Sequence, residues 1–120
     1  MRSSVAVSIM VALGLLAAGG VFAQGNPFNP LARLKLSNED MAAAGAAADA
    51  LYQAGAVGKT SEWANATSGN AGTVKLLETF EYEGYPCRSV EHVVKTARNL
   101  DPSTLVIKSC QVEDGSWKLI

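Results

Sequence analysis

The sequence has few of the side chains on which metal sites and enzyme active sites are built. Among its 120 residues are one histidine, His92, and two cysteines, Cys87 and Cys110. A metal site needs several convergent ligands, and a disulfide between the cysteines would leave only His92 and scattered carboxylates. No serine has a Gly-x-Ser-x-Gly setting, and no glycine-rich loop follows a strand and opens a helix. We therefore expect no metal, no cofactor and no enzyme activity.

Clustered positive charge and long apolar segments are also scarce. The 10 Lys and Arg residues are dispersed among 11 Asp and Glu residues, which gives a formal net charge of −1. Because nucleic-acid-binding surfaces need clustered basic side chains, nucleic acid is not an expected partner. After position 23 no apolar run is long enough to span a bilayer, so we expect no transmembrane segment in the mature chain.

The first residues predict a secretory signal peptide over residues 1–23. The basic Arg2 precedes an almost uninterrupted apolar run from position 5 to 18, and Val21 and Ala23 form a cleavage pattern after which we place the cut. The alternative, a retained membrane anchor, would need a longer apolar run of about 20 residues. No cysteine stands near the cut to serve as a lipid-attachment residue, so the mature chain is expected to start at Gln24 without acyl chains.

Export to an oxidising compartment favours one disulfide between the two cysteines over the alternative of two free thiols. Residues 24–35 are predicted to be a flexible tether, because prolines and polar residues dominate their first part. The packed domain is predicted to span residues 36–120.

An alanine-rich helix is expected from Met41 to Ala54. Ser37 and Asp40 have the spacing of a capping box before it, and Gly55 suits the left-handed residue that ends a helix. Gly45 in this run also fits a helix-pairing motif, but a single helix packed on a sheet is the commoner arrangement.

After position 61, β-branched and aromatic residues alternate with turn signals. This pattern predicts an α+β fold, with one N-terminal helix packed on a four- to five-stranded antiparallel meander. The expected strands are Glu62–Asn65, Thr73–Glu81, Tyr85–Thr96, Thr104–Val112 and Ser116–Ile120.

The disulfide fixes the strand register, because its two residues must lie close together on neighbouring strands, with Cα atoms about 5.5 Å apart. Placing Cys87 opposite Cys110 brings Val90 opposite Ile107 and His92 opposite Leu105 on one apolar face. A three-residue loop at 113–115 then pairs Gln111 with Trp117 and Ser109 with Leu119.

For the other hairpin we favour a three-residue loop at 82–84 over a two-residue loop at 83–84. The longer loop pairs Leu76 with Val90, Val74 with His92, and Glu78 with Arg88, whereas the shorter loop would bring Lys75 onto the apolar face. The resulting core, covered by the helix, is Val74, Leu76, Phe80, Val90, Val94, Leu105, Ile107, Trp117 and Leu119.

The remaining candidate residues each have a structural interpretation. His92 is a possible general base, but a packed, hydrogen-bonded core histidine is the commoner case. Glu78 and Arg88 are expected to form a structural ion pair between strands. Trp63 and Tyr85 could offer an aromatic binding surface, although Trp63 is more easily explained by packing against the sheet.

Several short motifs occur in this chain in the same order as in one bacterial family. They are Trp63-Ala64-Asn65, Ser68-Gly69-Asn70-Ala71-Gly72, Cys87-Arg88, Cys110 and Asp114-Gly115-Ser116-Trp117. With this order the chain resembles the C-terminal surface antigen domain typified by the seventeen-kilodalton bacterial outer-membrane antigen. The resemblance covers residues 36–120 and implies a small, β-rich, disulfide-bonded envelope domain without an established catalytic activity. The residues that match the family are Trp63, Asn65, Gly69, Gly72, Arg88, Asp114, Gly115 and Trp117.

Two departures limit what the resemblance carries. Members of the family often have a lipid-modified cysteine and a glycine-zipper segment before the domain, and residues 24–33 supply neither. The arginine that often follows the second cysteine is Gln111 here.

We therefore expect a non-enzymatic, exported cell-envelope protein that acts through contacts with another envelope protein. It would be periplasmic or associated with the cell surface, with peripheral outer-membrane association as a further possibility. The alternatives are a soluble periplasmic inhibitor or ligand-binding module and, third, a small hydrolase that uses His92.

Overall fold

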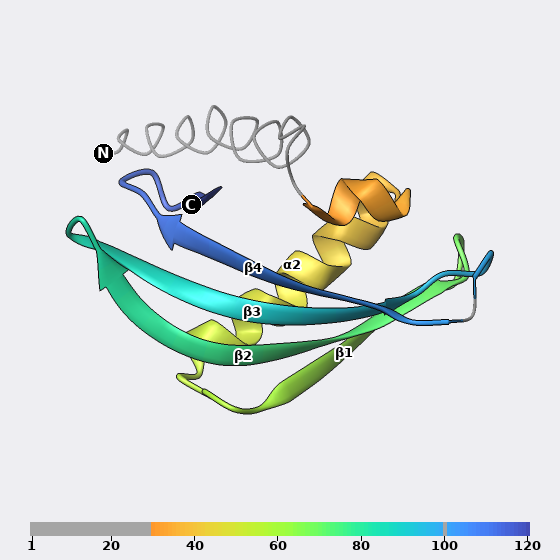
Figure 1. Cartoon of the computed structure of the whole chain (residues 1–120), viewed down its shortest axis with the longest axis horizontal. Helices are drawn as coiled ribbons and strands as arrows, with labels where there is room; N and C mark the ends of the chain where they lie inside the picture. Colours follow the sequence, from red (N-terminus) through yellow and green to blue (C-terminus); the bar gives the residue numbers. More distant parts are fainter. Residues whose placement is uncertain (1–29, 100) are drawn as a thin grey trace, which may run out of the picture.

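The computed structural model describes residues 30–99 and 101–120, so the predicted signal peptide and its cleavage site lie outside the described part. The predicted α+β fold is confirmed: one helix packs on a five-stranded antiparallel sheet with the meander order β1-β2-β3-β4-β5 (Figure 1). The elements are η1 (Pro30–Leu34), α2 (Asn38–Gln53), β1 (Thr60–Asn65), β2 (Asn70–Tyr82), β3 (Tyr85–Lys95), β4 (Ser103–Gln111) and β5 (Trp117–Leu119).

Helix α2 begins at the predicted capping box. The Ser37 hydroxyl accepts a hydrogen bond from the Asp40 N–H at 3.0 Å, and the Asp40 carboxylate accepts one from the Ser37 N–H at 2.9 Å. These bonds satisfy two of the amides that a helix start leaves without partners. The helix ends as predicted, because Gly55 after the C-cap has a φ of 63°, which glycine adopts readily.

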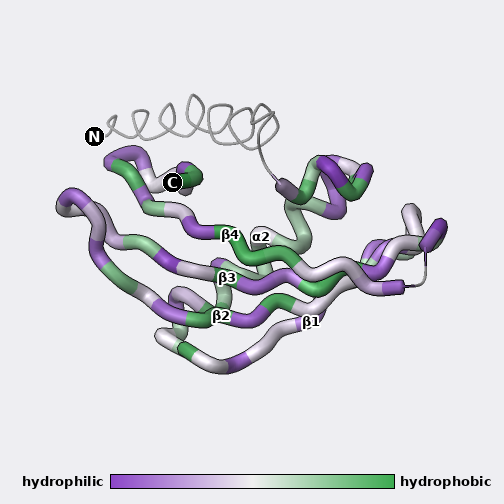
Figure 2. The backbone as a smooth tube through the Cα atoms, viewed as in Figure 1, coloured by the Kyte–Doolittle hydropathy of each residue, from purple (hydrophilic) through white to green (hydrophobic). Residues whose placement is uncertain are grey.

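One face of the sheet, called the inner face below, packs against α2. The buried apolar residues of α2 are Ala44, Ala47, Ala48 and Leu51, and the helix lies mainly over β1 and β2. Small alanine side chains let the helix approach the strands closely. Figure 2 shows hydrophobic and hydrophilic residues alternating along the strands, as expected for a sheet with one covered face.

Part of the predicted tether is packed against the domain. Residues 30–34 form the short 3-10 helix η1, which contacts β4, and the Leu31 side chain is only 4% exposed. Leu31 and Leu36 both belong to the hydrophobic core. The packed part of the chain therefore includes residues 30–35.

The predicted registers of β3 with β4 and of β4 with β5 are confirmed. Cys87 lies opposite Cys110, and Val90 lies opposite Ile107. Gln111 pairs with Trp117, and Ser109 pairs with Leu119. The Cys87–Cys110 disulfide is also confirmed; the two Cα atoms are 3.9 Å apart, closer than the expected separation.

The predicted loop between β2 and β3 is wrong. Tyr82 pairs with Tyr85, which leaves only Glu83 and Gly84 in the turn. Both have positive φ angles, 51° and 85°, as a type I′ hairpin turn requires. Leu76 still faces Val90, as predicted, because a β-bulge at Leu77 inserts the extra residue that restores the register.

The bulge corrects two further predictions. Glu78 pairs with Ser89 instead of Arg88, so the expected Glu78–Arg88 ion pair is not formed. Phe80 pairs with Cys87 on the outer face of the sheet, where it is half-buried and lies outside the core. The bulge shifts side-chain alternation by one residue, which moves Phe80 to the opposite face.

The other predicted core residues are confirmed at the centre of the sheet, whereas those at its β5 edge are only partly buried. Val74, Leu76, Val90 and Val94 are at most 3% exposed. Leu105 and Ile107 are partly buried against them. On the same inner face Trp117 and Leu119 are half-exposed, since α2 covers mainly β1 and β2.

Candidate functional site

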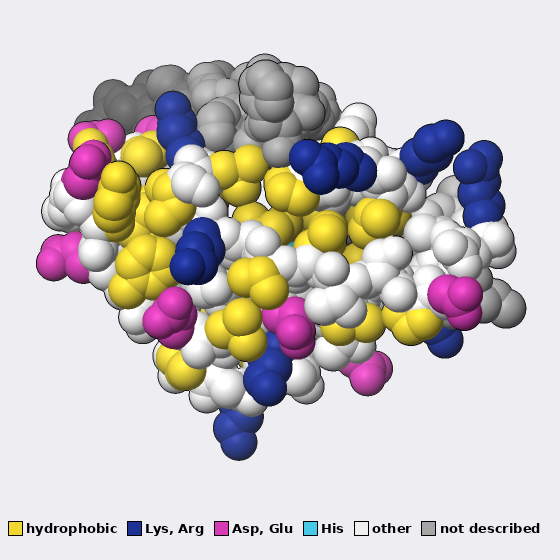
Figure 3. All heavy atoms as spheres, viewed as in Figure 1, with side chains coloured by type: hydrophobic (Ala, Val, Ile, Leu, Met, Phe, Trp, Pro, Cys, Tyr) yellow, Lys and Arg dark blue, Asp and Glu magenta, His cyan; other side chains and the backbone are white. Residues whose placement is uncertain are grey.

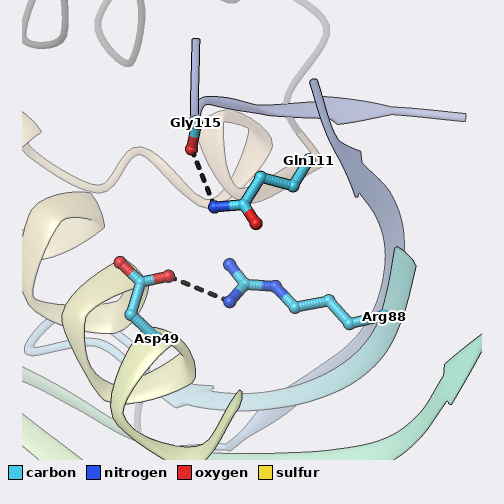
Figure 4. Close-up of polar contacts among 4 residues, drawn as sticks. All are labelled: Asp49, Arg88, Gln111 and Gly115. Atoms are coloured by element: carbon cyan, nitrogen blue, oxygen red, sulfur yellow. Dashed lines mark hydrogen bonds and ion pairs between the residues drawn. The ribbon is translucent and has the colours of Figure 1, made fainter. Parts of the chain in front are cut away.

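Arg88 projects from the start of β3 on the inner face and bonds to the helix. Its Nη1 donates to the Asp49 carboxylate of α2 at 2.9 Å, as Figure 4 shows. Asp49 is 55% exposed, while the Arg88 side chain is 8% exposed. The arginine is therefore held at the edge of the core by a carboxylate that remains in contact with water.

Two aromatic rings complete this arrangement. The Arg88 guanidinium carbon lies 3.9 Å from the centroid of the Trp117 ring and 5.9 Å from that of Tyr52. The two rings meet edge to face, with their centroids 4.9 Å apart. Cation–π contacts of this kind are worth about 0.5–2 kcal/mol, depending on desolvation. We call Asp49, Tyr52, Arg88 and Trp117 the Arg88 cluster.

The turn between β4 and β5 places Trp117 over the arginine. Asp114 accepts hydrogen bonds from both the N–H and the hydroxyl of Ser116, at 2.9 and 2.6 Å. Gly115 has a φ of 88°, and its carbonyl accepts a bond from the Gln111 side chain (Figure 4). The Asp-Gly-Ser-Trp motif thus works as a turn that directs Trp117 onto Arg88.

The electrostatics of the cluster follow from its burial. Burial lowers the pKa of the Arg88 guanidinium, while its hydrogen bond and charge interaction with Asp49 act in the opposite direction. Arginine nevertheless keeps its charge, because its ordinary pKa lies far above neutrality. The cluster therefore holds a permanent cation against two aromatic rings that contact each other.

His92 lies further along the same face of β3 and is neutral at physiological pH. Its side chain is 5% exposed, and burial, with a further contribution from the Arg88 charge, lowers its pKa to about 4. The predicted core position is confirmed, but Nδ1 has no hydrogen-bond partner among the described residues. That part of the prediction, a hydrogen-bonded histidine, is wrong for this nitrogen.

A second polar group surrounds Asp40, whose side chain is completely buried at the start of α2. Its carboxylate accepts hydrogen bonds from the Asn65 and Asn70 amides, both at 2.8 Å, and from the Ser68 hydroxyl at 2.7 Å. Burial alone would raise the pKa of Asp40, but these bonds and the Ser37 N–H hold it well below its usual value. We call Ser37, Asp40, Asn65, Ser68 and Asn70 the Asp40 network.

The two glycines of the Ser68-Gly69-Asn70-Ala71-Gly72 motif allow close packing next to the Asp40 network. A Cβ on Gly72 would lie 2.6 Å from the indole nitrogen of Trp63 and 2.9 Å from the Val93 carbonyl oxygen. Gly69 has a φ of 80° and lies against Ala97. Trp63, 7% exposed, packs against the sheet, so it does not offer a binding surface.

The residues singled out from the sequence thus fall into three places. Trp63, Asn65, Gly69 and Gly72 surround or adjoin the Asp40 network; Arg88, Asp114, Gly115 and Trp117 build the Arg88 cluster; and Cys87 and Cys110 form the disulfide on the outer face. Tyr85 is separate, half-buried, and donates to Glu113 at 2.9 Å.

Sequence reasoning missed Asp49 and Tyr52. They lie three positions apart on α2 and therefore project from one side of the helix, but nothing local links them to Arg88 on β3. Within residues 30–99 and 101–120 no group of three or more His, Cys, Asp and Glu side chains is placed to hold a metal ion. Nor does this part of the chain contain a helix long and apolar enough to cross a membrane.

Comparisons with protein-family models, with curated proteins and with solved structures give no match to this chain.

Proposed function

We propose that this chain is an exported, non-enzymatic cell-envelope protein with a surface-antigen-like domain that acts by binding another envelope protein. The N-terminal residues support export, and the Cys87–Cys110 disulfide is compatible with an oxidising compartment. In this proposal the domain is periplasmic or associated with the cell surface.

The observation that carries the binding role is the Arg88 cluster. Arginine, tryptophan and tyrosine are the side chains most enriched among residues that dominate the energy of protein interfaces. Here one of each is held in a fixed mutual geometry, and both rings remain half-exposed. A partner that covered Trp117 and Tyr52 would bury aromatic area with little loss of side-chain freedom.

The surface beside the cluster is suited to the same role. Leu119 follows Trp117 on the inner face of β5, and Ile107 lies on the inner face of β4; both are half-exposed. Helix α2 packs mainly over β1 and β2, away from these two strands. The cluster and the two aliphatic residues together offer an apolar area with a cation in it, as many interface centres do.

The motifs of the surface antigen family also support this proposal. Of the matching residues, Asn65 bonds to Asp40 at the start of α2, and Trp63, Gly69 and Gly72 are closely packed beside it. The other four build the Arg88 cluster and its turn, and all of these roles serve a binding scaffold. In the Cys-Arg pair, the Cys87 disulfide joins β3 to β4 on one face of the sheet, and Arg88 projects from the opposite face into the cluster.

Site-specific crosslinking in intact cells tests the proposal. Benzoylphenylalanine would be incorporated at position 119 on the inner face or, as the matched control, at the 52%-exposed position of Val106 on the outer face of β4. We expect a discrete crosslinked protein from position 119 that is absent from position 106 and is lost when Trp117→Ala is added. Identical products from both positions, or only background from position 119, would contradict the proposal.

A further inference from the structure

A pocket of about 210 Å³ opens at the end of the sheet away from the Arg88 cluster. Three segments meet there: Leu34 and Lys35 at the end of η1, Ser68 and Asn70 of the β1–β2 hairpin, and residues 96–98 after β3. In Figure 3, several Lys and Arg side chains gather at the upper right of the molecule, over the region where Figure 1 shows η1 and these two loops.

The Asp40 network fixes the shape of this pocket. The Ser68 hydroxyl and the Asn70 side-chain amide both donate to the Asp40 carboxylate, and the Asn70 side-chain oxygen Oδ1 accepts a hydrogen bond from the Ala97 N–H at 2.9 Å. One buried carboxylate thus holds the β1–β2 hairpin, which in turn holds the loop after β3. A site whose walls are already ordered loses little conformational entropy on binding.

Two basic residues are among those that line the pocket. Lys35 and Arg98 are exposed, and neither forms an ion pair with another described residue. Lys35 has a φ of 60°, a left-handed conformation that is uncommon for lysine, and its N–H donates to the Ala32 carbonyl. The described residues that line the pocket include these two cationic residues and no Asp or Glu.

We propose that this pocket binds a phosphate group of a small ester or lipid headgroup. A tetrahedral phosphate has oxygens pointing in several directions, and so it can bind one cation from η1 and another from the loop after β3 at once. The planar Arg98 fork suits two phosphate oxygens, and the Lys35 ammonium suits a third. Leu34 and Ala97 line the same pocket and would contact the carbon part of the ester.

This proposal is independent of the proposed partner binding. The pocket and the Arg88 cluster use opposite ends of β3, with residues 96–98 just beyond Lys95 and Arg88 close to Tyr85. A variant in the pocket therefore leaves the crosslinking site unchanged, and the two proposals can fail separately.

The test is a titration of the mature chain with inorganic phosphate at constant ionic strength, followed by backbone amide chemical shifts. We expect saturable shifts at the pocket amides of Ser68, Ala97 and Arg98. Combining Arg98→Gln with Lys35→Asn should weaken binding at least tenfold, and asparagine is chosen because it tolerates the left-handed conformation at position 35. The control Lys108→Gln removes an exposed cation in the middle of β4 and should leave the affinity unchanged.

Vesicles distinguish the two sources of the phosphate group. Co-sedimentation with phosphatidylglycerol vesicles but not with phosphatidylcholine vesicles, lost in the double variant, would identify an anionic lipid headgroup. Saturable phosphate binding without co-sedimentation would identify a soluble phosphate ester. The absence of both effects, or equal weakening by Lys108→Gln and by the double variant, would overturn the proposal; unchanged melting temperatures exclude misfolding of the variants as the cause.

Discussion

At the scale of single residues, Asp40 and His92 show two different outcomes of burying a polar group. The Asp40 carboxylate accepts four hydrogen bonds, so its charge is retained although no part of it reaches solvent. The His92 ring is nearly as buried, and its Nδ1 is unpaired, so burial favours the neutral form.

Replacing Asp40 with asparagine should destabilise the fold. Asp40→Asn places an NH₂ group where donors from Ser37, Asn65, Ser68 and Asn70 converge, and at least one buried donor then loses its acceptor. We expect the free energy of unfolding to fall by about 2–4 kcal/mol in urea denaturation. The exposed Glu39→Gln, one position earlier in the helix, should change it by less than about 0.5 kcal/mol. Equal effects of the two substitutions would show that the Asp40 network adds no stability.

His92 should make the protein less stable in mild acid. Its pKa is about 4 in the folded chain, whereas an unperturbed histidine has a pKa of 6.5. Below pH 6.5 the unfolded chain therefore binds a proton that the folded chain does not, and stability decreases as the pH falls toward 4. The loss attributable to His92 approaches about 3 kcal/mol.

The pH dependence is measured by urea unfolding between pH 7.5 and 4.5. In His92→Leu the slope over this range should be clearly smaller than in the unchanged protein. Asp40 contributes little in this window, because the loss that its lowered pKa causes begins near and below pH 3.8. An equally steep slope in His92→Leu would contradict the assignment.

At the scale of secondary structure elements, the hairpin between β2 and β3 shows what the sequence could and could not predict. Hydrophobic alternation correctly placed Leu76 opposite Val90, but it could not distinguish a longer loop from a shorter loop with a bulge. The adjacent leucines Leu76 and Leu77 fit the inner face equally well, and only the three-dimensional register shows which one is the extra residue. The error propagated to Glu78 and Phe80, which lie beyond the bulge.

The Arg88 cluster was hard to predict for a different reason. Arg88 and Trp117 were selected from the sequence, and the predicted registers of β3 with β4 and of β4 with β5 were right. Asp49 lies 39 positions from Arg88, on an element whose placement over the sheet the strand pattern does not determine. The β3–β4 and β4–β5 strand pairs could be predicted because the disulfide and a local turn signal fix them, whereas helix-to-sheet contacts depend on packing of the whole core.

Two glycines in different elements should respond in opposite ways to alanine. Gly72→Ala would force a Cβ against the Trp63 ring and the Val93 carbonyl between β1 and β3, and we expect a loss of about 2 kcal/mol. Gly45→Ala in α2 meets open space and should stabilise the protein by about 0.5–1 kcal/mol. Thermal unfolding of the two variants measures both; a Gly72→Ala protein as stable as the parent would show that β1 packs less closely than described.

At the scale of the whole molecule, α2 connects two separate sites. Asp40 in its first turn anchors the loops around the pocket, and Asp49 and Tyr52 in its second half anchor Arg88. The disulfide lies on the opposite face of the sheet and fixes β3 to β4. Together, α2 and the disulfide hold the pocket and the Arg88 cluster in place at the two ends of the sheet.

Removing the disulfide should lower the stability of the whole domain. Cys87 and Cys110 are 23 positions apart, and by the chain-entropy argument closing such a loop contributes about 3 kcal/mol. Cys87→Ala with Cys110→Ala should lose about that amount in urea unfolding, while the amide spectrum stays native-like because the strand pairs remain. A loss below about 1 kcal/mol would show that the disulfide is not a main source of stability.

The most direct test of the central claim, an exported disulfide-bonded envelope domain, is the intact mass of the native protein from fractionated cells. The mass is measured with and without reduction before alkylation. We predict a chain that begins at Gln24, lies in the envelope fractions, and gains two alkyl groups only after reduction. A chain that keeps residues 1–23, carries a lipid, or is alkylated without reduction would contradict the claim.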